Sequence, residues 1–310
     1  MKWLIALLLL SACTVTGNVV KEYSLDTEVY FCPRDNCRQM FFNEIYAAND
    51  VNCAIYDLDL AEIITLLKVK NAKLVFDHET SNRTELIKIG AVLDSKNTQM
   101  HNKFCILDNK TVITGSMNPT LRDTGLNNNN LLILHSESIA KTYMEEFYEL
   151  HNATFSGGKR TKQSEFYLNN EKILIYFCPE DWCVNKILDA MAPAAKSIYF
   201  MTFSFTHDKI GDMLIDKHNQ GLIVKGVMEK TQNNAFSEYE RLNKSGVDVM
   251  WDKNKGNMHH KVFVVDESIV ITGSINPSIN GDTKNDENLL IIESPRLAKM
   301  YIEEYGIISK

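Results

Sequence analysis

The chain has 310 residues, which is enough for about two domains with cores of their own. Its hydrophobic content of 45% and charged content of 24% are those of an ordinary globular protein and exclude an intrinsically disordered chain. The formal net charge of −7 argues against a protein that grips nucleic acid by broad neutralisation of phosphates, but it leaves room for a local basic cleft.

The first predicted element is an export signal over residues 1–12. Lys2 precedes an apolar run, Trp3 to Leu10, that is too short to span a bilayer. The Leu-Ser-Ala-Cys segment that ends at Cys13 resembles the bacterial lipobox, in which the cysteine is lipidated and becomes the mature N-terminus. We therefore expect an exported lipoprotein, anchored on the extracytoplasmic side of a membrane through Cys13. The alternative is a secreted protein whose ordinary signal peptide is cut nearby.

The rest of the chain repeats one order of strands and helices. The first domain is predicted over residues 22–155 and the second over residues 167–310, with a polar, glycine-rich linker at 156–166. Each copy alternates strands with helices and closes with a helix, which predicts an α/β fold with a mixed β-sheet flanked by helices in each domain. The expected strands are 28–32, 51–56, 73–76, 103–107, one ending at 114, and 130–134 in the first copy, and 173–178, 197–203, 223–228, 261–265, one ending at 272, and 288–292 in the second.

Six cysteines follow Cys13, and four of them form two matching segments. Cys32 and Cys37 stand in the first copy, and Cys178 and Cys183 stand in the second. We expect Cys32-Cys37 and Cys178-Cys183 to close small disulfide loops at the start of a helix, as in an oxidising compartment. A four-cysteine zinc site is the competing interpretation. The other two, Cys53 and Cys105, lie in apolar strand-like runs and are either buried thiols or a third bridge.

One polar motif occurs in both copies. It reads His-x-Lys-x-x-x-x-Asp and is closed by Gly-Ser-x-Asn-Pro, and every member of the second copy follows its counterpart by 158 residues. Two complete patterns in register indicate a duplicated unit in which each half supplies half of one active site. The members are His101, Lys103, Asp108, Gly115, Ser116, Asn118 and Pro119, and then His259, Lys261, Asp266, Gly273, Ser274, Asn276 and Pro277.

The spacing of the motif suits chemistry on an anion. Residues i and i+2 of a strand point to the same face, so the histidine and lysine of each copy project together. The lysine would neutralise oxygen charge that grows in a transition state, and the histidine would attack phosphorus or move a proton. The serine and asparagine of each motif would offer short donors to the same anion. Surface histidines on ordinary strands would explain one such histidine, but not two matched constellations.

With both motifs in one polypeptide, the chain resembles the phospholipase D superfamily over essentially its whole mature length. The resemblance implies two similar domains packed about a pseudo-twofold axis, with the paired motifs meeting in one cleft. It also implies that one histidine attacks a phosphodiester to form a phosphohistidine and that the other protonates the leaving alcohol. No metal ion or other cofactor is required, and both half-sites in one chain imply a monomer.

The resemblance assigns roles to the residues of the motif. His101 and His259 would be the nucleophile and the general acid, and Asp108 and Asp266 would be structural. The expected phosphate-binding groups are Lys103, Lys261, Asn118 and Asn276, with Ser116 and Ser274 in support.

The two copies differ at one position that bears on the mechanism. Family members often place a glutamate just before the last strand, where it can orient a catalytic histidine. The second half has Glu287 there, whereas the first half has Asn129. A carboxylate that accepts from an imidazole fixes its tautomer and raises its basicity, so the two histidines are not equivalent. The family default makes His101 the nucleophile, whereas the position of Glu287 could instead favour His259.

Two other histidines invite a metal or relay role. His78 lies at the end of a predicted strand and has no counterpart in the second half. His260 should point away from His259, because adjacent residues of a strand face opposite ways. We expect both to be packed or solvated rather than catalytic.

Three functions remain open. The first is a membrane-anchored phospholipase D-type enzyme that hydrolyses or exchanges phospholipid head groups. The second is a metal-independent extracytoplasmic nuclease of the same superfamily, favoured by the compact halves and by Lys159, Arg160 and Lys162 in the linker. The third is a non-catalytic surface binding protein, against which the two complete motifs argue. The substrate is therefore a phosphodiester of a phospholipid or of a nucleic acid.

Overall fold

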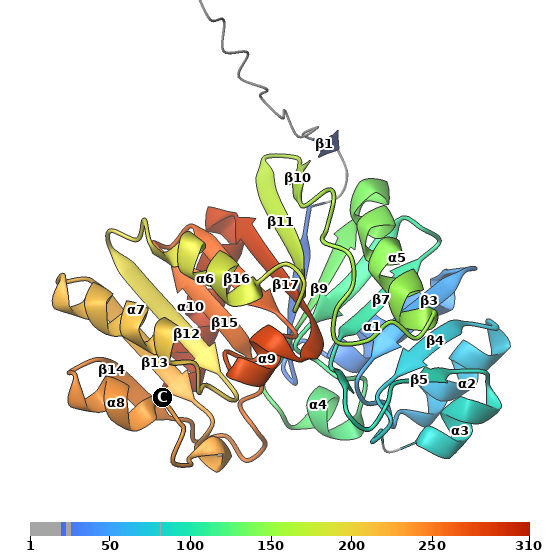
Figure 1. Cartoon of the computed structure of the whole chain (residues 1–310), viewed down its shortest axis with the longest axis horizontal. Helices are drawn as coiled ribbons and strands as arrows, with labels where there is room; N and C mark the ends of the chain where they lie inside the picture. The colour runs from blue at the N-terminus through green and yellow to red at the C-terminus, as the bar shows by residue number, and fades with distance from the viewer. Residues whose placement is uncertain (1–19, 23–25, 81) are drawn as a thin grey trace, which may run out of the picture.

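The fold contains two β-sheets that lie side by side, each built mainly from one half of the chain (Figure 1). The computed structural model describes residues 20–22, 26–80 and 82–310. The predicted export signal and the lipidation site Cys13 lie outside these residues. Within the described ranges, no helix is both long and apolar enough to cross a membrane.

The first sheet has seven strands in the order β2-β9-β8-β7-β3-β4-β5. Pairing is antiparallel from β2 through to β3 and parallel from β3 to β5, so the sheet is mixed. Its strands are β2 (Glu28–Cys32), β3 (Val51–Ile55), β4 (Lys73–Phe76), β5 (Val92–Leu93), β7 (Lys103–Leu107), β8 (Thr111–Gly115) and β9 (Asn129–His135). The helices of this half are α1 (Cys37–Ala47), α2 (Ala61–Val69), α3 (Arg83–Lys88), α4 (Leu121–Gly125) and α5 (Glu137–His151).

The second sheet repeats this order. Its run β11-β17-β16-β15-β12-β13-β14 reproduces the seven strands of the first sheet, which confirms the duplicated α/β fold. The strands are β10 (Glu165–Leu168), β11 (Glu171–Cys178), β12 (Ser197–Thr202), β13 (Ile223–Met228), β14 (Asp248–Trp251), β15 (Lys261–Val265), β16 (Ile269–Gly273) and β17 (Asn285–Glu293). The helices are α6 (Cys183–Met191), α7 (Asp208–Asn219), the 3-10 turn η1 (Lys230–Gln232), α8 (Tyr239–Lys244), α9 (Ile279–Thr283) and α10 (Pro295–Ile308).

Two short strands of the first half belong to the second sheet. β1 (Val20–Glu22) pairs with β10, and β6 (Gln99–Met100) pairs with β17. The sequence pattern did not predict them, because two or three residues are too few to show a period. β10 also begins at Glu165, within the stretch assigned to the linker. β6 matters most for function, because it directly precedes the first motif histidine.

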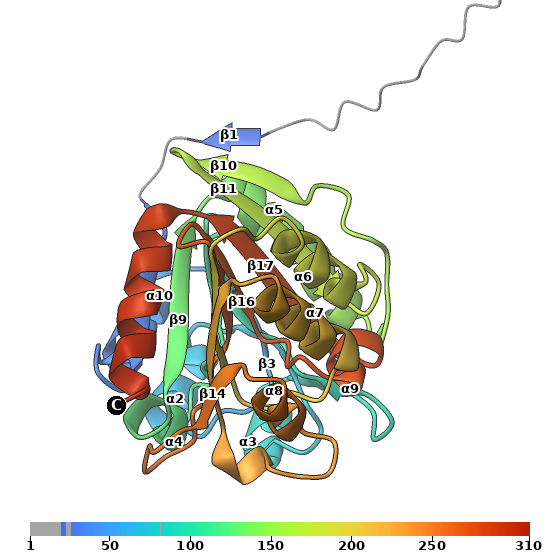
Figure 2. The same ribbon diagram turned by 90° about the vertical axis from the view of Figure 1, so that its left-hand side faces the viewer.

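A shared apolar core fixes the two halves to each other. It lies between the sheets and includes the closing helices α5 and α10. The hydroxyl of Tyr301 on α10 accepts from Asn130 Nδ2 of β9 at 3.0 Å, and that of Tyr143 on α5 accepts from Asn288 Nδ2 of β17 at 3.0 Å. Each closing helix therefore reaches the last strand of the other half, and Figure 2 shows α10 running alongside β9. This exchange is the pseudo-twofold packing that the resemblance implies.

Three disulfide bridges occur in the described chain, namely Cys32–Cys37, Cys178–Cys183 and Cys53–Cys105. The first two close the short loops that enter α1 and α6, as expected, and their formation overturns the alternative of a four-cysteine zinc site. The third joins β3 to β7 and answers the question that the sequence left open. Three bridges indicate an oxidising compartment outside the cytoplasm.

Candidate active site

Backbone hydrogen bonds between the halves bring the two motif histidines together. His101 follows β6, and its backbone N–H donates to Asp286 O of β17 at 3.0 Å. The second half mirrors this arrangement, because the N–H of His259 donates to Asn128 O at 2.8 Å. The first residue of each motif is therefore hydrogen-bonded to the opposite half through its backbone. This backbone pairing sets the position of both imidazoles.

Each histidine side chain is held by a residue of the other half. His101 Nδ1 lies 2.7 Å and 2.8 Å from the two carboxylate oxygens of Glu287. His259 Nδ1 lies 2.8 Å from Asn129 Oδ1. The idea that Glu287 serves His259, the histidine of its own half, is therefore wrong. Each last strand stays in the sheet of its own half, but its side chain reaches the histidine of the other half.

Burial lowers the pKa of both histidines. The pKa of His101 falls to about 4, because burial, with smaller contributions from the lysines, outweighs the attraction of Glu287. The pKa of His259 falls well below its ordinary value because of burial and then because of Lys261, Lys103 and His101. Groups of both motifs thus act on one imidazole, so the motifs meet in one enclosed site. His101 is 6% exposed and His259 is 8% exposed.

The two lysines stand in the same enclosed site. Lys103 Nζ donates to His101 O at 2.8 Å, and Lys261 Nζ donates to His259 O at 2.8 Å. Burial lowers the pKa of Lys103 to about 8, and burial together with Lys103 lowers the pKa of Lys261 well below its ordinary value. Two ammonium groups that repel each other in a dry site are stabilised by a bound anion.

Two aromatic side chains border the site and were missed by sequence reasoning. Tyr56 directly follows β3, and its ring centroid lies 4.7 Å from that of His101. Phe203 directly follows β12 and lies 4.7 Å from His259 in the same way. The lysine nitrogens lie over these rings, at 5.0 Å in the first half and 5.2 Å in the second. Each aromatic residue directly follows the equivalent strand of its half, and this matched position is the sequence signal that could have identified the pair.

The serines of the motifs do not have the surroundings that we expected. Ser274 Oγ donates to Glu287 Oε2 at 2.6 Å, whereas Ser116 Oγ donates to Asn130 Oδ1 at 2.9 Å and lies farther, at 3.3 Å, from Asn129 Oδ1. Both hydroxyls are therefore bound within the protein instead of pointing free donors at an anion, and that of Ser274 holds the carboxylate that faces His101. Of the asparagines, Asn118 also uses its donor within the protein, since its Nδ2 donates to Asp123 Oδ2 at 2.8 Å. The side-chain oxygens of Asn118 and Asn276 are buried without a hydrogen-bond partner in the described chain.

The motif aspartates close backbone turns outside the reacting groups. Asp108 Oδ1 accepts from the N–H groups of Asn49 and Asp50 at 2.9 Å and 2.7 Å. Asp266 accepts in the same way from three successive backbone N–H groups, at 2.7–2.9 Å. Although burial raises the pKa of Asp266, these three bonds outweigh it and lower the pKa overall. Such surroundings suit the structural role that the resemblance implies.

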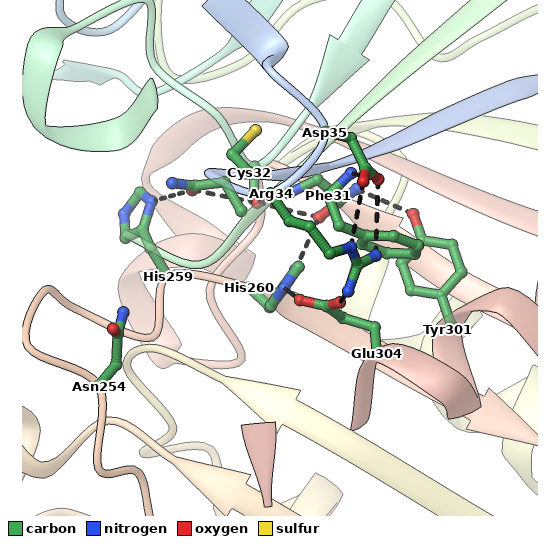
Figure 3. A network of polar contacts seen from close by, with 12 residues as sticks. Phe31, Cys32, Arg34, Asp35, Asn254, His259, His260, Tyr301 and Glu304 are labelled. Carbon is green, nitrogen blue, oxygen red and sulfur yellow. Dashed lines mark hydrogen bonds and ion pairs between the residues drawn. The ribbon is translucent and has the colours of Figure 1, made fainter. Parts of the chain in front are cut away.

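His260 is part of a buried polar network beside the site (Figure 3). Its Nδ1 lies 3.3 Å from Asn130 Oδ1, and its Nε2 lies 3.6 Å from a carboxylate oxygen of Glu304. Glu304 also accepts from Arg34 of the first half. Figure 3 shows the His260 ring turned toward Glu304 and the His259 ring turned away from it. His260 therefore packs, as its position on the strand predicts.

Two groups of possible metal ligands occur in the described chain, and neither includes a residue of the motifs. One is Asp77, His78 and Asp94, and the other is Glu146, Glu149 and Glu180. In the first group, Asp94 already accepts from the backbone N–H of His78 and from that of Met100. Its oxygens are therefore used by the fold, in keeping with the packed role expected of His78.

Comparisons with known proteins show what the chain is similar to. A family model described as "Cardiolipin synthase, PLD-like domain" matches residues 29–151 and 187–306. A phospholipase D of Rickettsia bellii is 32% identical over 139 residues, which cover 44% of this chain and 69% of the relative. A mitochondrial cardiolipin hydrolase of Mus musculus is 31% identical over 124 residues, 39% of this chain and 56% of that protein. The solved phosphatidylserine synthase of Haemophilus influenzae has a TM-score of 0.67 at 14% identity, covering 90% of this chain and 86% of that one, and so shares the fold.

Proposed function

The chain belongs to the phospholipase D-like family of phosphodiesterases, and from this premise we propose that it cleaves phospholipid phosphodiesters through a phosphohistidine on His101. The observation that carries the assignment is the contact of both Glu287 oxygens with His101 Nδ1. A carboxylate that accepts the Nδ1 proton leaves a lone pair on Nε2. It also stabilises the positive charge that the ring gains when Nε2 bonds to phosphorus.

His259 is suited to the other proton-transfer role. Its Nδ1 faces the neutral amide of Asn129, which fixes the ring without the full stabilisation that a carboxylate gives to the protonated form. A bound phosphodiester adds a negative charge beside Lys103 and Lys261, and this charge favours protonation of His259. The protonated ring then gives its Nε2 proton to the leaving alcohol.

The reaction closes in two steps. In the first, His101 Nε2 bonds to phosphorus, the bond from phosphorus to the head-group oxygen breaks, and that oxygen takes the proton of His259. In the second, neutral His259 takes a proton from water, the hydroxide attacks phosphorus, and the bond to His101 breaks. The products are the alcohol and a phosphomonoester, and both rings return to their starting forms.

The choice of a phospholipid substrate rests on two supports. Two relatives that are 32% and 31% identical over the 139 and 124 residues aligned are named phospholipase D and cardiolipin hydrolase. The three disulfides indicate an extracytoplasmic compartment, where a lipid anchor at Cys13 would hold the site beside a bilayer. We propose that the protein acts there as an anchored monomer.

The proposal is tested by offering two substrates in the presence of a chelator. Phosphatidylcholine and cardiolipin vesicles are compared with plasmid DNA, using the wild type and the variants His101→Ala and His259→Ala. We expect the vesicles to be hydrolysed by the wild type and by neither variant. Cleavage of plasmid DNA alone would favour the nuclease, and full activity of either variant would contradict a shared site.

A further inference from the structure

One buried carboxylate of the first half has no counterpart in the second. Asp123 lies in α4, and the residue 158 positions later, in the matching helix α9, is Gly281. Asp123 is 4% exposed. Its Oδ2 lies 3.5 Å from His259 Nδ1, the histidine whose direct partner is an amide. The half that lacks a carboxylate at position 129 thus has one six residues earlier.

Asp123 is held firmly at this position. Its Oδ2 accepts from both the backbone N–H and the side-chain Nδ2 of Asn118, each at 2.8 Å. Its Oδ1 accepts from Asn127 Nδ2 at 2.6 Å. Three donors on a buried carboxylate stabilise its charged form. They also tie it to Asn118, which is one of the expected phosphate-binding groups.

The second half uses the same donor for its own carboxylate. Asn285 stands 158 residues after Asn127, and its Nδ2 lies 3.2 Å from Glu287 Oε1. The two asparagines therefore occupy matched positions, and each binds the acidic group of its half. Only the chain position of the carboxylate differs, being 287 in the second half and 123 in the first.

We propose that Asp123 is the displaced charge partner of His259, supplying from α4 the negative charge that Asn129 cannot. In the second half, Glu287 both fixes the ring of His101 and balances its charge. For His259 these tasks are divided, because Asn129 accepts the Nδ1 proton and Asp123 provides the charge. Asp123 is thus a positioning residue, and its assignment as partner of the general acid rests on the function proposed above.

The charges around His259 explain why this partner is needed. The groups that act on its ring from the packed elements are Lys261, Lys103, His101, His260 and, at 3.5 Å, Asp123. The two lysines oppose protonation of His259, and Asp123 also raises the pKa of each lysine. Removing this charge would leave Glu287 to balance both ammonium groups, with help from Asp77 and Asp57 only at Lys103. His259 and both lysines would then lose their protons at lower pH.

The test uses Asp123→Asn in the full chain, with Asp123→Glu as the variant that keeps the charge. An opposite charge at this distance shifts a pKa by roughly one unit or more. We expect the alkaline limb of the kcat profile to move down by about one pH unit in Asp123→Asn, so that kcat becomes up to about tenfold lower than that of the wild type at pH values above the wild-type limb. Asp123→Glu should keep the limb within a few tenths of a unit. Adding Asn129→Glu, the residue of the second half, to Asp123→Asn should move the limb back.

A measurement that needs no turnover distinguishes failure of this proposal from failure of the proposed function. NMR of histidine labelled with nitrogen-15 follows the titration of the His259 ring with saturating inorganic phosphate, even if no substrate is cleaved. We expect its midpoint to fall in Asp123→Asn and to recover with Asn129→Glu, while the melting temperature shows that each variant is folded. A folded Asp123→Asn protein with an unchanged midpoint and an unchanged limb would overturn the proposal. Absence of cleavage by the wild type would instead count against the proposed function.

Discussion

Replacing Glu287 with glutamine would test the role of the carboxylate that faces His101. The change keeps the size of the side chain and removes its charge. Glu287 is fully buried and contacts His101 Nδ1 with both oxygens, so solvent cannot replace the lost charge. A hydrogen bond to a charged group contributes about 1.5–3 kcal/mol in such surroundings. Formation of the phosphohistidine should therefore slow by about 10- to 150-fold.

Rapid mixing with bis(p-nitrophenyl) phosphate isolates this step. The p-nitrophenolate leaves without needing a proton, so the burst of colour reports attack by His101 and not acid catalysis by His259. Asn129→Ala is the matched control, since it removes the direct partner of His259. It should leave the burst nearly unchanged and slow the hydrolysis that follows. A burst in Glu287→Gln within about twofold of the wild type, or an equal slowing in Asn129→Ala, would refute the reasoning.

Three further predictions concern pH, a hydroxyl and a disulfide. Because His101 attacks only when neutral and its pKa is about 4, kcat/KM should fall below about pH 4. On the alkaline side it should fall first as His259, whose pKa lies well below its ordinary value, loses the proton that it gives to the leaving alcohol, and again above about pH 8 as Lys103 loses its charge. A profile flat from pH 6 to 10 would contradict this. Ser274→Ala removes one hydrogen bond to the carboxylate that faces His101, so kcat should drop about fivefold, and an unchanged kcat would contradict that support. Replacing Cys53 and Cys105 together with alanine should cost about 2–4 kcal/mol in guanidinium unfolding, and a loss below about 1 kcal/mol would show that this buried bridge is dispensable.

The order of strands was predictable because each long strand shows its own hydrophobic run and because the same order of runs occurs in both copies. The pairings between the halves were not. β6 has only two residues, which are too few to show a hydrophobic period. The hydrogen bond from the N–H of His101 to Asp286 O depends on how the two sheets meet, and a local hydrophobic period contains no information about that. For the same reason the sequence could not show that Glu287 would reach the histidine of the other half.

The site was predictable at its centre and less so around it. The spacing of each motif indicated both histidine and lysine pairs, but the serines turned out to bind side chains of the last strands, Glu287 for Ser274 and Asn130 for Ser116. That outcome depends on the last strand returning beside the motif, which is a tertiary feature. Asp123 did leave a signal, because aligning the copies sets it against Gly281. This difference between the copies becomes informative only in the structure, where Asp123 Oδ2 lies 3.5 Å from His259 Nδ1.

Locating the covalent intermediate tests the role of His101 most directly. Asn129→Ala should slow hydrolysis of this intermediate, and p-nitrophenolate leaves without a proton from His259, so this variant is mixed with bis(p-nitrophenyl) phosphate, quenched in base, digested and examined by mass spectrometry. We predict a p-nitrophenyl phosphoryl group on the peptide that contains His101 and none on the peptide that contains His259. The same group on His259 would contradict the assignment of His101 as the nucleophile.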